Sequence, residues 1–167
     1  MTAALPTSAP AWFRRLMPLP PAPVASANPA PDRESALARF AELLAVDEAV
    51  PEATRSRLFE PDGAATATIV IWHGFTNAPS QFVAVSEELC AAGYRVLLPR
   101  MPYHGEADVL NRDLAKLTEL DLADQVQTCV DIAAGFGDPV WTIGLSAGAT
   151  LAGWAAATRP AVRRLVL

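Results

Sequence analysis

From Thr66 onward the chain alternates short apolar runs with longer segments in which apolar and polar residues mix at helical spacing. The apolar runs are rich in β-branched residues and predict strands, whereas the mixed segments predict helices. The predicted strands are ATIVIWHGF, YRVLLP, PVWTIGL and VRRLVL, and the predicted helices are PSQFVAVSEELCAAG, LTELDLADQVQTCVDIAAGFG and SAGATLAGWAAAT. Nearly continuous apolar strands separated by helices indicate a three-layer α/β fold with a mainly parallel sheet.

An amphipathic helix is predicted over residues 32–51, before this alternation begins. Its apolar positions are three and four residues apart, at Leu37, Phe40, Ala41 and Leu44. Arg39, Glu42 and Asp47 fall on the other faces. A short strand within TRSRLFEPDG follows and ends in a turn at residues 61–63.

The first 31 residues carry 8 of the 15 prolines, so they cannot form a continuous helix. We expect residues 1–31 to be an extended or disordered segment rich in proline and alanine. Arg14 and Arg15, followed by apolar residues and then Ala25-Ser26-Ala27, resemble an export leader, but prolines interrupt the apolar region that such a leader needs. The pattern therefore favours a cytoplasmic protein over an exported one, and export stays open as an alternative.

Residues 140–158 contain no charged side chain and are numerous enough to cross a bilayer. A membrane helix is therefore one interpretation of this run. Pro139 and the β-branched residues before Leu145 favour a strand, however, and the residues after Ser146 favour a helix. We therefore expect a strand, a turn and a helix, with no transmembrane segment.

Composition excludes several classes of function. The 13 basic and 18 acidic side chains give a net charge of -5, and no basic cluster exceeds the pairs Arg14/Arg15 and Arg163/Arg164, so nucleic acid is not expected as a partner. Cys90 and Cys129 lie far apart in the sequence and have no histidine beside them. They indicate buried, inert thiols, with no metal site, disulfide or cofactor.

The segment Gly144-Leu145-Ser146-Ala147-Gly148 fits the pattern G-x-S-x-G between a predicted strand and a predicted helix. A turn this sharp brings the positions two before and two after the serine together, so larger side chains would collide there. Ser146 is then exposed above the sheet, next to the free amides at the start of a helix. This arrangement is typical of a nucleophilic serine.

A second motif, His73-Gly74-Phe75, ends an earlier predicted strand. We expect Gly74 to allow a tight turn, so that the backbone amide of Phe75 faces the same pocket as the amide of Ala147. Two such donors would form an oxyanion hole for a tetrahedral intermediate.

The chain resembles the N-terminal half of an α/β-hydrolase, in the branch of serine esterases, monoacylglycerol lipases and serine aminopeptidase-like enzymes. The resemblance rests on HGFTNAPSQF, LCAAGYRVLLPRMPYHGEAD, GLSAG and RPAVRRLVL. It implies hydrolysis of a small-molecule or lipid ester by Ser146 without a metal or cofactor, the amides of Phe75 and Ala147 as the oxyanion hole, and a structural role for His73. PYHG replaces the commoner GHG, which places Tyr103 where glycine is usual.

The catalytic triad of this fold runs serine, acid, histidine along the chain, yet no acid or histidine follows Ser146. We therefore expect residues 52–167 to be an incomplete domain with an exposed last strand that is nearly inactive alone. We expect it to be a truncated gene product, a fragment, or one half of a protein that needs its missing C-terminal half. A catalytically silent remnant or binding module is the alternative.

Overall fold

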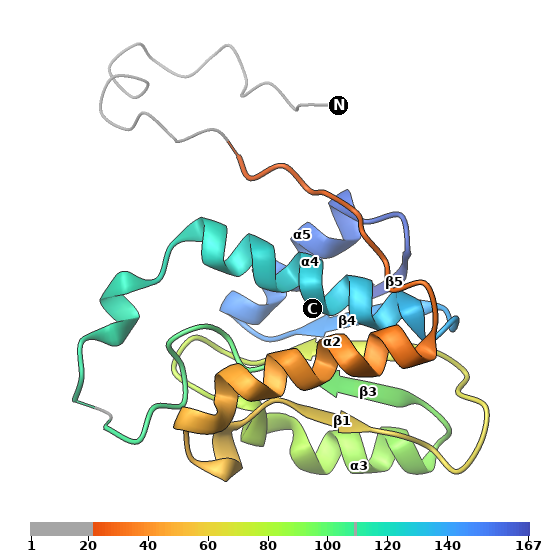
Figure 1. Cartoon of the computed structure of the whole chain (residues 1–167), viewed down its shortest axis with the longest axis horizontal. Coiled ribbons are helices and arrows are strands. Elements are labelled where there is room, and N and C mark those ends of the chain that lie inside the picture. The colour runs from red at the N-terminus through yellow and green to blue at the C-terminus, as the bar shows by residue number, and fades with distance from the viewer. Residues whose placement is uncertain (1–21, 109) are drawn as a thin grey trace.

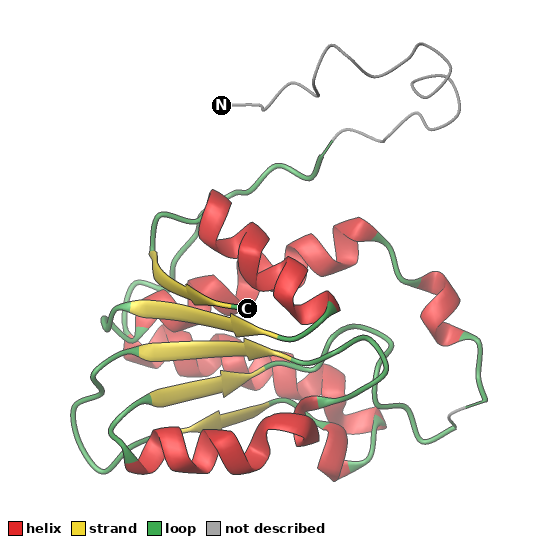
Figure 2. Cartoon of the chain, turned by 180° about the vertical axis from the view of Figure 1, so that it is seen from behind, coloured by secondary structure: helices red, strands yellow, loops and turns green. Residues whose placement is uncertain are grey.

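The computed structural model describes residues 22–108 and 110–167. In this part of the chain five strands form one sheet in the order β1-β3-β2-β4-β5, and they run side by side in Figures 1 and 2. The strands are β1 (Arg57–Phe59), β2 (Thr68–Trp72), β3 (Arg95–Leu98), β4 (Val140–Gly144) and β5 (Val162–Val166). Only β1, at one edge, is antiparallel to its neighbour. The predicted mainly parallel sheet is confirmed.

Helices cover both faces of the sheet and complete the expected three layers (Figure 1). The helices are α2 (Arg33–Val46), α3 (Val83–Ala91), α4 (Glu119–Gly135) and α5 (Ala147–Thr158), with short 3-10 turns at Asp47–Ala49, Glu52–Thr54, Pro79–Phe82 and Asp113–Lys116. Helices α2, α4 and α5 form one layer with the apolar core around Trp72, and α3 covers the other face around Ile71. Thr118 begins α4 with a capping box to Asp121, which satisfies amides at the start of that helix.

Strand β2 lies in the middle of the sheet, and all five of its residues are buried. Its side chains alternate between the two faces, so Val70 and Trp72 contribute to one core cluster and Ile69 and Ile71 to the other. The last residues of β2 and β4 therefore occupy fixed positions at the carboxyl end of the parallel strands. The loops that carry Phe75 and Ser146 start from this end of the sheet.

The buried face of α2 differs from the predicted one. Ala36 and Phe40 are buried, whereas Leu37 and Ala41 are exposed. Asp47, which we placed on another face than the apolar residues, is buried and pairs with Arg100. The helix also ends at Val46, before the predicted boundary at residue 51.

Residues 1–21 of the proline-rich segment lie outside the described residues. Residues 22–31 form no helix or strand, but their last part is fixed to α4. The amide of Asn28 donates to the Asp131 carboxylate at 3.1 Å, and the amide of Ala30 donates to the Asp131 carbonyl at 3.0 Å. Ala30 is also buried. Residues 28–30 are therefore an irregular segment held against α4 by hydrogen bonds.

The uncharged run of residues 140–158 is not one helix. It divides at Ser146 into β4 and α5, and none of the helices within residues 22–108 and 110–167 is both apolar and long enough to span a bilayer. The membrane-helix interpretation is therefore wrong. As expected, β5 is an exposed edge strand, with Leu165 and Val166 open to solvent.

Candidate active site

Ser146 occupies the turn between β4 and α5 and is exposed. Its backbone has φ 57° and ψ -118°, a left-handed conformation that is strained for a residue with a side chain. The tight spacing of the strand and the helix imposes this conformation. The residue is open to solvent, and its side chain makes no capping hydrogen bond to α5.

The two glycines around Ser146 are required because a side chain at either position would collide with backbone atoms. A Cβ atom at Gly144 would lie 2.1 Å from the carbonyl oxygen of Gly148. A Cβ atom at Gly148 would lie 2.2 Å from the carbonyl oxygen of Trp72 at the end of β2. Both contacts are with backbone, which cannot rotate away as a side chain can. The glycine spacing of the motif therefore allows β2, β4 and α5 to touch.

The loop after β2 passes beside Ser146. A Cβ atom at Gly74 would lie 4.0 Å from the Ser146 Cβ. The amide of Gly74 donates to the Gln81 side chain at 3.0 Å, and its carbonyl accepts from the Asn77 amide at 3.0 Å, which closes the turn. Because φ of Gly74 lies outside the left-handed region and its Cβ would meet only ordinary contacts, this turn does not require glycine, contrary to our expectation.

The amides of Phe75 and Ala147 belong to the two loops that meet at Gly74 and Ser146. Within the described part of the chain, neither amide donates a hydrogen bond to another protein group. Both are therefore free to bind a ligand oxygen. The side chain of Phe75 itself is 45% exposed.

His73 is buried and connects the ends of β2 and β3. Its Nε2 accepts from the Met101 amide at 3.1 Å, and its Nδ1 lies 2.8 Å from the Gly74 carbonyl. A carbonyl only accepts, so the proton is on Nδ1 and neither ring nitrogen is free to take a proton from Ser146. Burial lowers the pKa of His73 to about 4, although its bond to the Gly74 carbonyl opposes the shift.

The low pKa of His73 makes stability depend on pH. Between its ordinary pKa of 6.5 and its folded pKa of about 4, the unfolded chain binds a proton at His73 that the folded chain does not, so stability falls as pH falls. We expect a loss of about 1.5 kcal/mol between pH 6.5 and pH 5, because the slope rises toward about 1.4 kcal/mol per pH unit as the unfolded histidine becomes protonated. Urea unfolding at several pH values measures this slope. His73→Gln should flatten it, and an equal slope in that variant would contradict the assignment.

The turn after β3 carries a second left-handed residue. Tyr103 has φ 62° and Gly105 has φ 70°, so the chain keeps the glycine-like backbone despite the tyrosine. Between them, His104 is buried, and its Nδ1 lies 2.9 Å from the Pro102 carbonyl. The His104 ring makes edge-to-face contacts with Phe75 and His73, each with ring centroids 5.2 Å apart.

Tyr103→Gly is expected to raise the free energy of unfolding by about 0.5–1 kcal/mol, because relief of left-handed strain exceeds the extra freedom of glycine in the unfolded chain. Gly105→Ala should do the opposite, since its Cβ would lie 2.6 Å from the Thr54 Cβ. Urea unfolding compares the two variants. Clear destabilisation by Tyr103→Gly would show that tyrosine contacts, and not backbone strain, dominate at this position.

A buried ion pair that the sequence did not reveal holds the same turn in place. Arg100 Nε donates to Asp47 at 2.7 Å, and its terminal nitrogen donates to the His104 carbonyl at 2.8 Å. Asp47 also accepts from the Ser56 amide at 2.7 Å. Asp47 and Arg100 are far apart in the sequence; Arg100 lies in the segment LCAAGYRVLLPRMPYHGEAD, but nothing in that segment indicates its pairing with Asp47.

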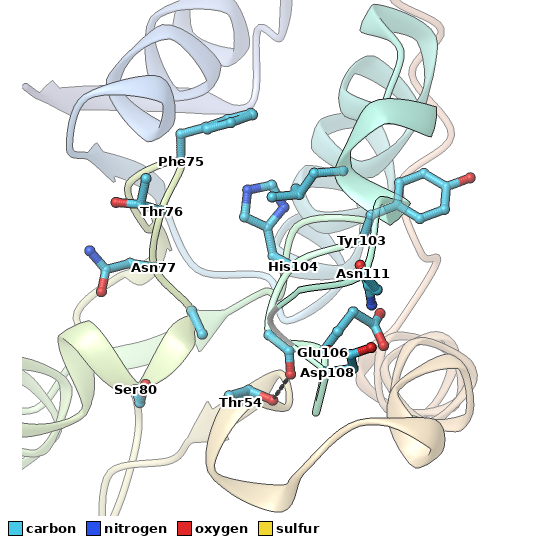
Figure 3. A pocket seen from close by; sticks show the side chains of 13 residues that line it. Thr54, Phe75, Thr76, Asn77, Ser80, Tyr103, His104, Glu106, Asp108 and Asn111 are labelled. Atoms are coloured by element: carbon cyan, nitrogen blue, oxygen red, sulfur yellow. Dashed lines mark hydrogen bonds between the residues drawn. The ribbon is translucent and has the colours of Figure 1, made fainter.

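A cavity of about 410 Å³ lies between the Phe75 loop and the turn at His104 (Figure 3). Thr54 closes it on another side and fixes the turn by donating to the Gly105 carbonyl at 2.7 Å. Phe75 is common to this cavity and to the loop beside Ser146, whereas Ser146 itself does not line the cavity.

The described residues include no partner that would activate Ser146. The chain contains two histidines, His73 and His104, and neither ring forms a hydrogen bond with Ser146. Residues 22–108 and 110–167 contain no cluster of histidine, cysteine and carboxylate side chains suited to a metal. Cys129 is buried, which raises the pKa of its thiol, but Cys90 is partly exposed, contrary to expectation.

Residues 69–167, more than half of the chain, match the sequence model of the alpha/beta hydrolase family. No curated protein matches the chain. Among solved structures, the chain is similar to a metagenome-derived lipolytic enzyme of the LipS and LipT pair, with 26% sequence identity and a TM-score of 0.56. The match covers 69% of this chain and 46% of that enzyme.

Two further structures share the fold. A lipase in its open form is 24% identical with a TM-score of 0.51, over 66% of this chain and 38% of that one. Acetyl xylan esterase 1 from Thermoanaerobacterium sp. JW/SL YS485 is 20% identical with a TM-score of 0.52, over 66% and 41%. The chain thus spans less than half the length of these three proteins. Because the family match covers more than half of the chain, including β3, β4, β5, most of β2, the loop after β2 and the Ser146 turn, the chain belongs to the alpha/beta hydrolase family.

Proposed function

We propose that this chain carries the nucleophile and the oxyanion hole of a serine ester hydrolase. The observation that carries the proposal is the placement of Ser146 at a strained, exposed turn beside Gly74, between two loops whose Phe75 and Ala147 amides are free. A strained backbone at an exposed serine is costly to maintain and is typical of a reactive site. The similarity to a lipolytic enzyme at 26% identity supports an ester as the substrate.

In the proposed reaction the Ser146 oxygen attacks the ester carbonyl carbon, and the carbonyl electron pair moves onto its oxygen. The amides of Phe75 and Ala147 donate to this oxyanion. When the carbonyl re-forms, the alcohol leaves with a proton and the acyl group stays on Ser146. Water then attacks the acyl-serine and releases the acid.

The proton transfers in these steps need a base that residues 147–167 do not contain. We propose that a C-terminal half supplies the acid and the histidine of the triad, as the order of the triad in this fold requires. Without them Ser146 is a weak nucleophile, and loss of the base costs about 10⁶ in kcat in a well-studied triad enzyme. The chain alone should therefore be nearly inactive toward esters.

A fluorophosphonate probe tests the nucleophile directly. At alkaline pH, where more serine alkoxide is present, we expect slow labelling that peptide mass spectrometry locates on Ser146 and that Ser146→Ala removes. Ser80→Ala is a matched control, because Ser80 is also an exposed serine on this side of the sheet. Labelling of other serines with equal efficiency would contradict the proposal.

The second candidate function is a catalytically silent member of the fold that binds a ligand or partner. The Ser146 hydroxyl without a hydrogen-bonded base in the described part of the chain favours it. Folded protein whose Ser146 stays unlabelled throughout the alkaline range would support this candidate over the enzyme.

A further inference from the structure

The peptide unit between Gly74 and Phe75 carries one of the two amides that the proposed reaction uses. The Gly74 carbonyl and the Phe75 amide point in opposite directions, because they belong to one trans peptide. That carbonyl accepts from His73 Nδ1 at 2.8 Å and from the Asn77 amide at 3.0 Å. These two bonds hold the unit at its carbonyl end, so the Phe75 amide is directed away from both donors.

The preceding peptide unit is held by Gln81. The amide of Gly74 donates to the Gln81 side-chain oxygen at 3.0 Å. Gly74 has no Cβ to restrict its φ and ψ, and a Cβ there would meet only ordinary contacts, the nearest at 3.8 Å. The conformation of Gly74, and with it the direction of the Phe75 amide, therefore depends on hydrogen bonds at both of its peptide units.

Gln81 reaches Gly74 from a well-anchored turn. It belongs to the 3-10 turn Pro79–Phe82, where Ala78 and Pro79 are buried and the Gln81 amide donates to the Ala78 carbonyl at 3.0 Å. Gln81 itself is exposed. Holding an exposed glutamine in one rotamer costs about as much conformational entropy as one hydrogen bond returns, so this bond adds little to the stability of the whole chain.

The Gln81 side chain also lies close to Ser146. The point that a Gly74 Cβ would occupy is 3.8 Å from the Gln81 oxygen and 4.0 Å from the Ser146 Cβ. We propose that Gln81 is a positioning residue for ester hydrolysis: its oxygen holds the Gly74 amide and thereby keeps the Phe75 amide directed at the oxyanion. The role in the reaction rests on the proposed function, whereas the hold on the loop rests on the contacts alone.

Amide relaxation in the free chain, measured by nuclear magnetic resonance, tests the hold on the loop. Gln81→Met keeps the length of the side chain and removes the acceptor. The order parameter of the Phe75 amide should then fall from about 0.85, typical of rigid backbone, to below about 0.6. Gln81→Ala should have the same effect, which separates the lost acceptor from new contacts of methionine. Gln81→Glu keeps an acceptor oxygen at this place and should keep the Phe75 amide rigid.

The fluorophosphonate probe tests the role in the reaction. Gln81→Met should lower the limiting labelling rate constant of Ser146 about tenfold, because a mobile donor loses part of the 10²–10³ that one oxyanion-hole donor contributes. The probe concentration that gives half of this rate should stay nearly the same, as should the urea unfolding curve. The phosphorus resonance of the adduct should shift between the unmodified chain and the variant. A contact that served only folding would change neither the rate constant nor this resonance.

Gln127→Met is the matched control. The Gln127 side-chain oxygen on α4 also accepts from a backbone amide, that of Ser26, but it lies outside the loops that carry Phe75 and Ser146. This variant should change neither the order of the Phe75 amide nor the labelling of Ser146.

The proposal is overturned if the Phe75 amide stays rigid in Gln81→Met, or if it becomes mobile while the labelling rate constant and the phosphorus resonance stay the same. In both cases labelled Ser146 would still support the nucleophile. If Ser146 of the unmodified chain is never labelled, the proposed function fails. A Phe75 amide that becomes mobile in Gln81→Met, and stays rigid in Gln81→Glu, would then still support the hold of Gln81 on this loop.

Discussion

Replacing Gly148 by alanine is expected to lower the free energy of unfolding by about 3 kcal/mol or more and to abolish labelling of Ser146. The added Cβ would lie 2.2 Å from the Trp72 carbonyl oxygen and 2.6 Å from the His73 carbonyl oxygen, so α5 has to move away from β2. Helix α5 begins directly after Ser146, and its displacement would also move the Ala147 amide. Urea unfolding measures the stability, and the fluorophosphonate probe reports the position of the serine.

Gly153→Ala in the same helix is the matched control. A Cβ atom at Gly153 would meet nothing within 4 Å, so the substitution should stabilise the helix by up to about 1 kcal/mol. Labelling of Ser146 should not change in this variant. If Gly148→Ala were as stable as Gly153→Ala, the close contact between β2 and α5 would be wrong.

Replacing Asp47 by alanine should cost about 3–5 kcal/mol, because it leaves Arg100 buried without its carboxylate partner. Asp47 and Arg100 side chains are 4% and 6% exposed. The loss should extend to the turn at His104, whose carbonyl accepts from the same guanidinium. Thermal or urea unfolding gives the stability, and the resonances of His104 report the state of the turn.

The pair between Asp113 and Lys116 provides the contrast, since its side chains are 38% and 62% exposed. Asp113→Ala should leave stability unchanged within error, because solvent screens such a pair. A small effect of Asp47→Ala, similar to that of Asp113→Ala, would indicate that Arg100 finds another partner or leaves the core.

The strands, the helices of the core and the Ser146 turn could be predicted from the sequence because their signals are local. A run such as Thr68–Trp72 is apolar and β-branched, and the two glycines around Ser146 have a fixed spacing that follows from contact between a strand and a helix. The antiparallel β1 could be predicted as a strand, but its direction depends on pairing with β3 and is not encoded locally.

The errors arose where long-range contacts decide. Phe40 fits both possible faces of α2, and the face that is buried is the one that packs against α4, a contact that no local pattern shows. Similarly, Asn28 and Ala30 are fixed by Asp131, far along the chain, and the composition of this segment does not show that contact. The unpaired Nε2 of His104 could not be predicted, because burial and the absence of a partner are properties of the folded chain.

The central claim is that two backbone amides from different loops converge on the oxygen that forms beside Ser146. A crystal structure of the chain after reaction with a phosphonate ester tests it most directly. We expect phosphorus bonded to the Ser146 oxygen and a phosphonyl oxygen about 3 Å from the amide nitrogens of both Phe75 and Ala147. An adduct whose phosphonyl oxygen points to solvent and meets neither amide would contradict the account.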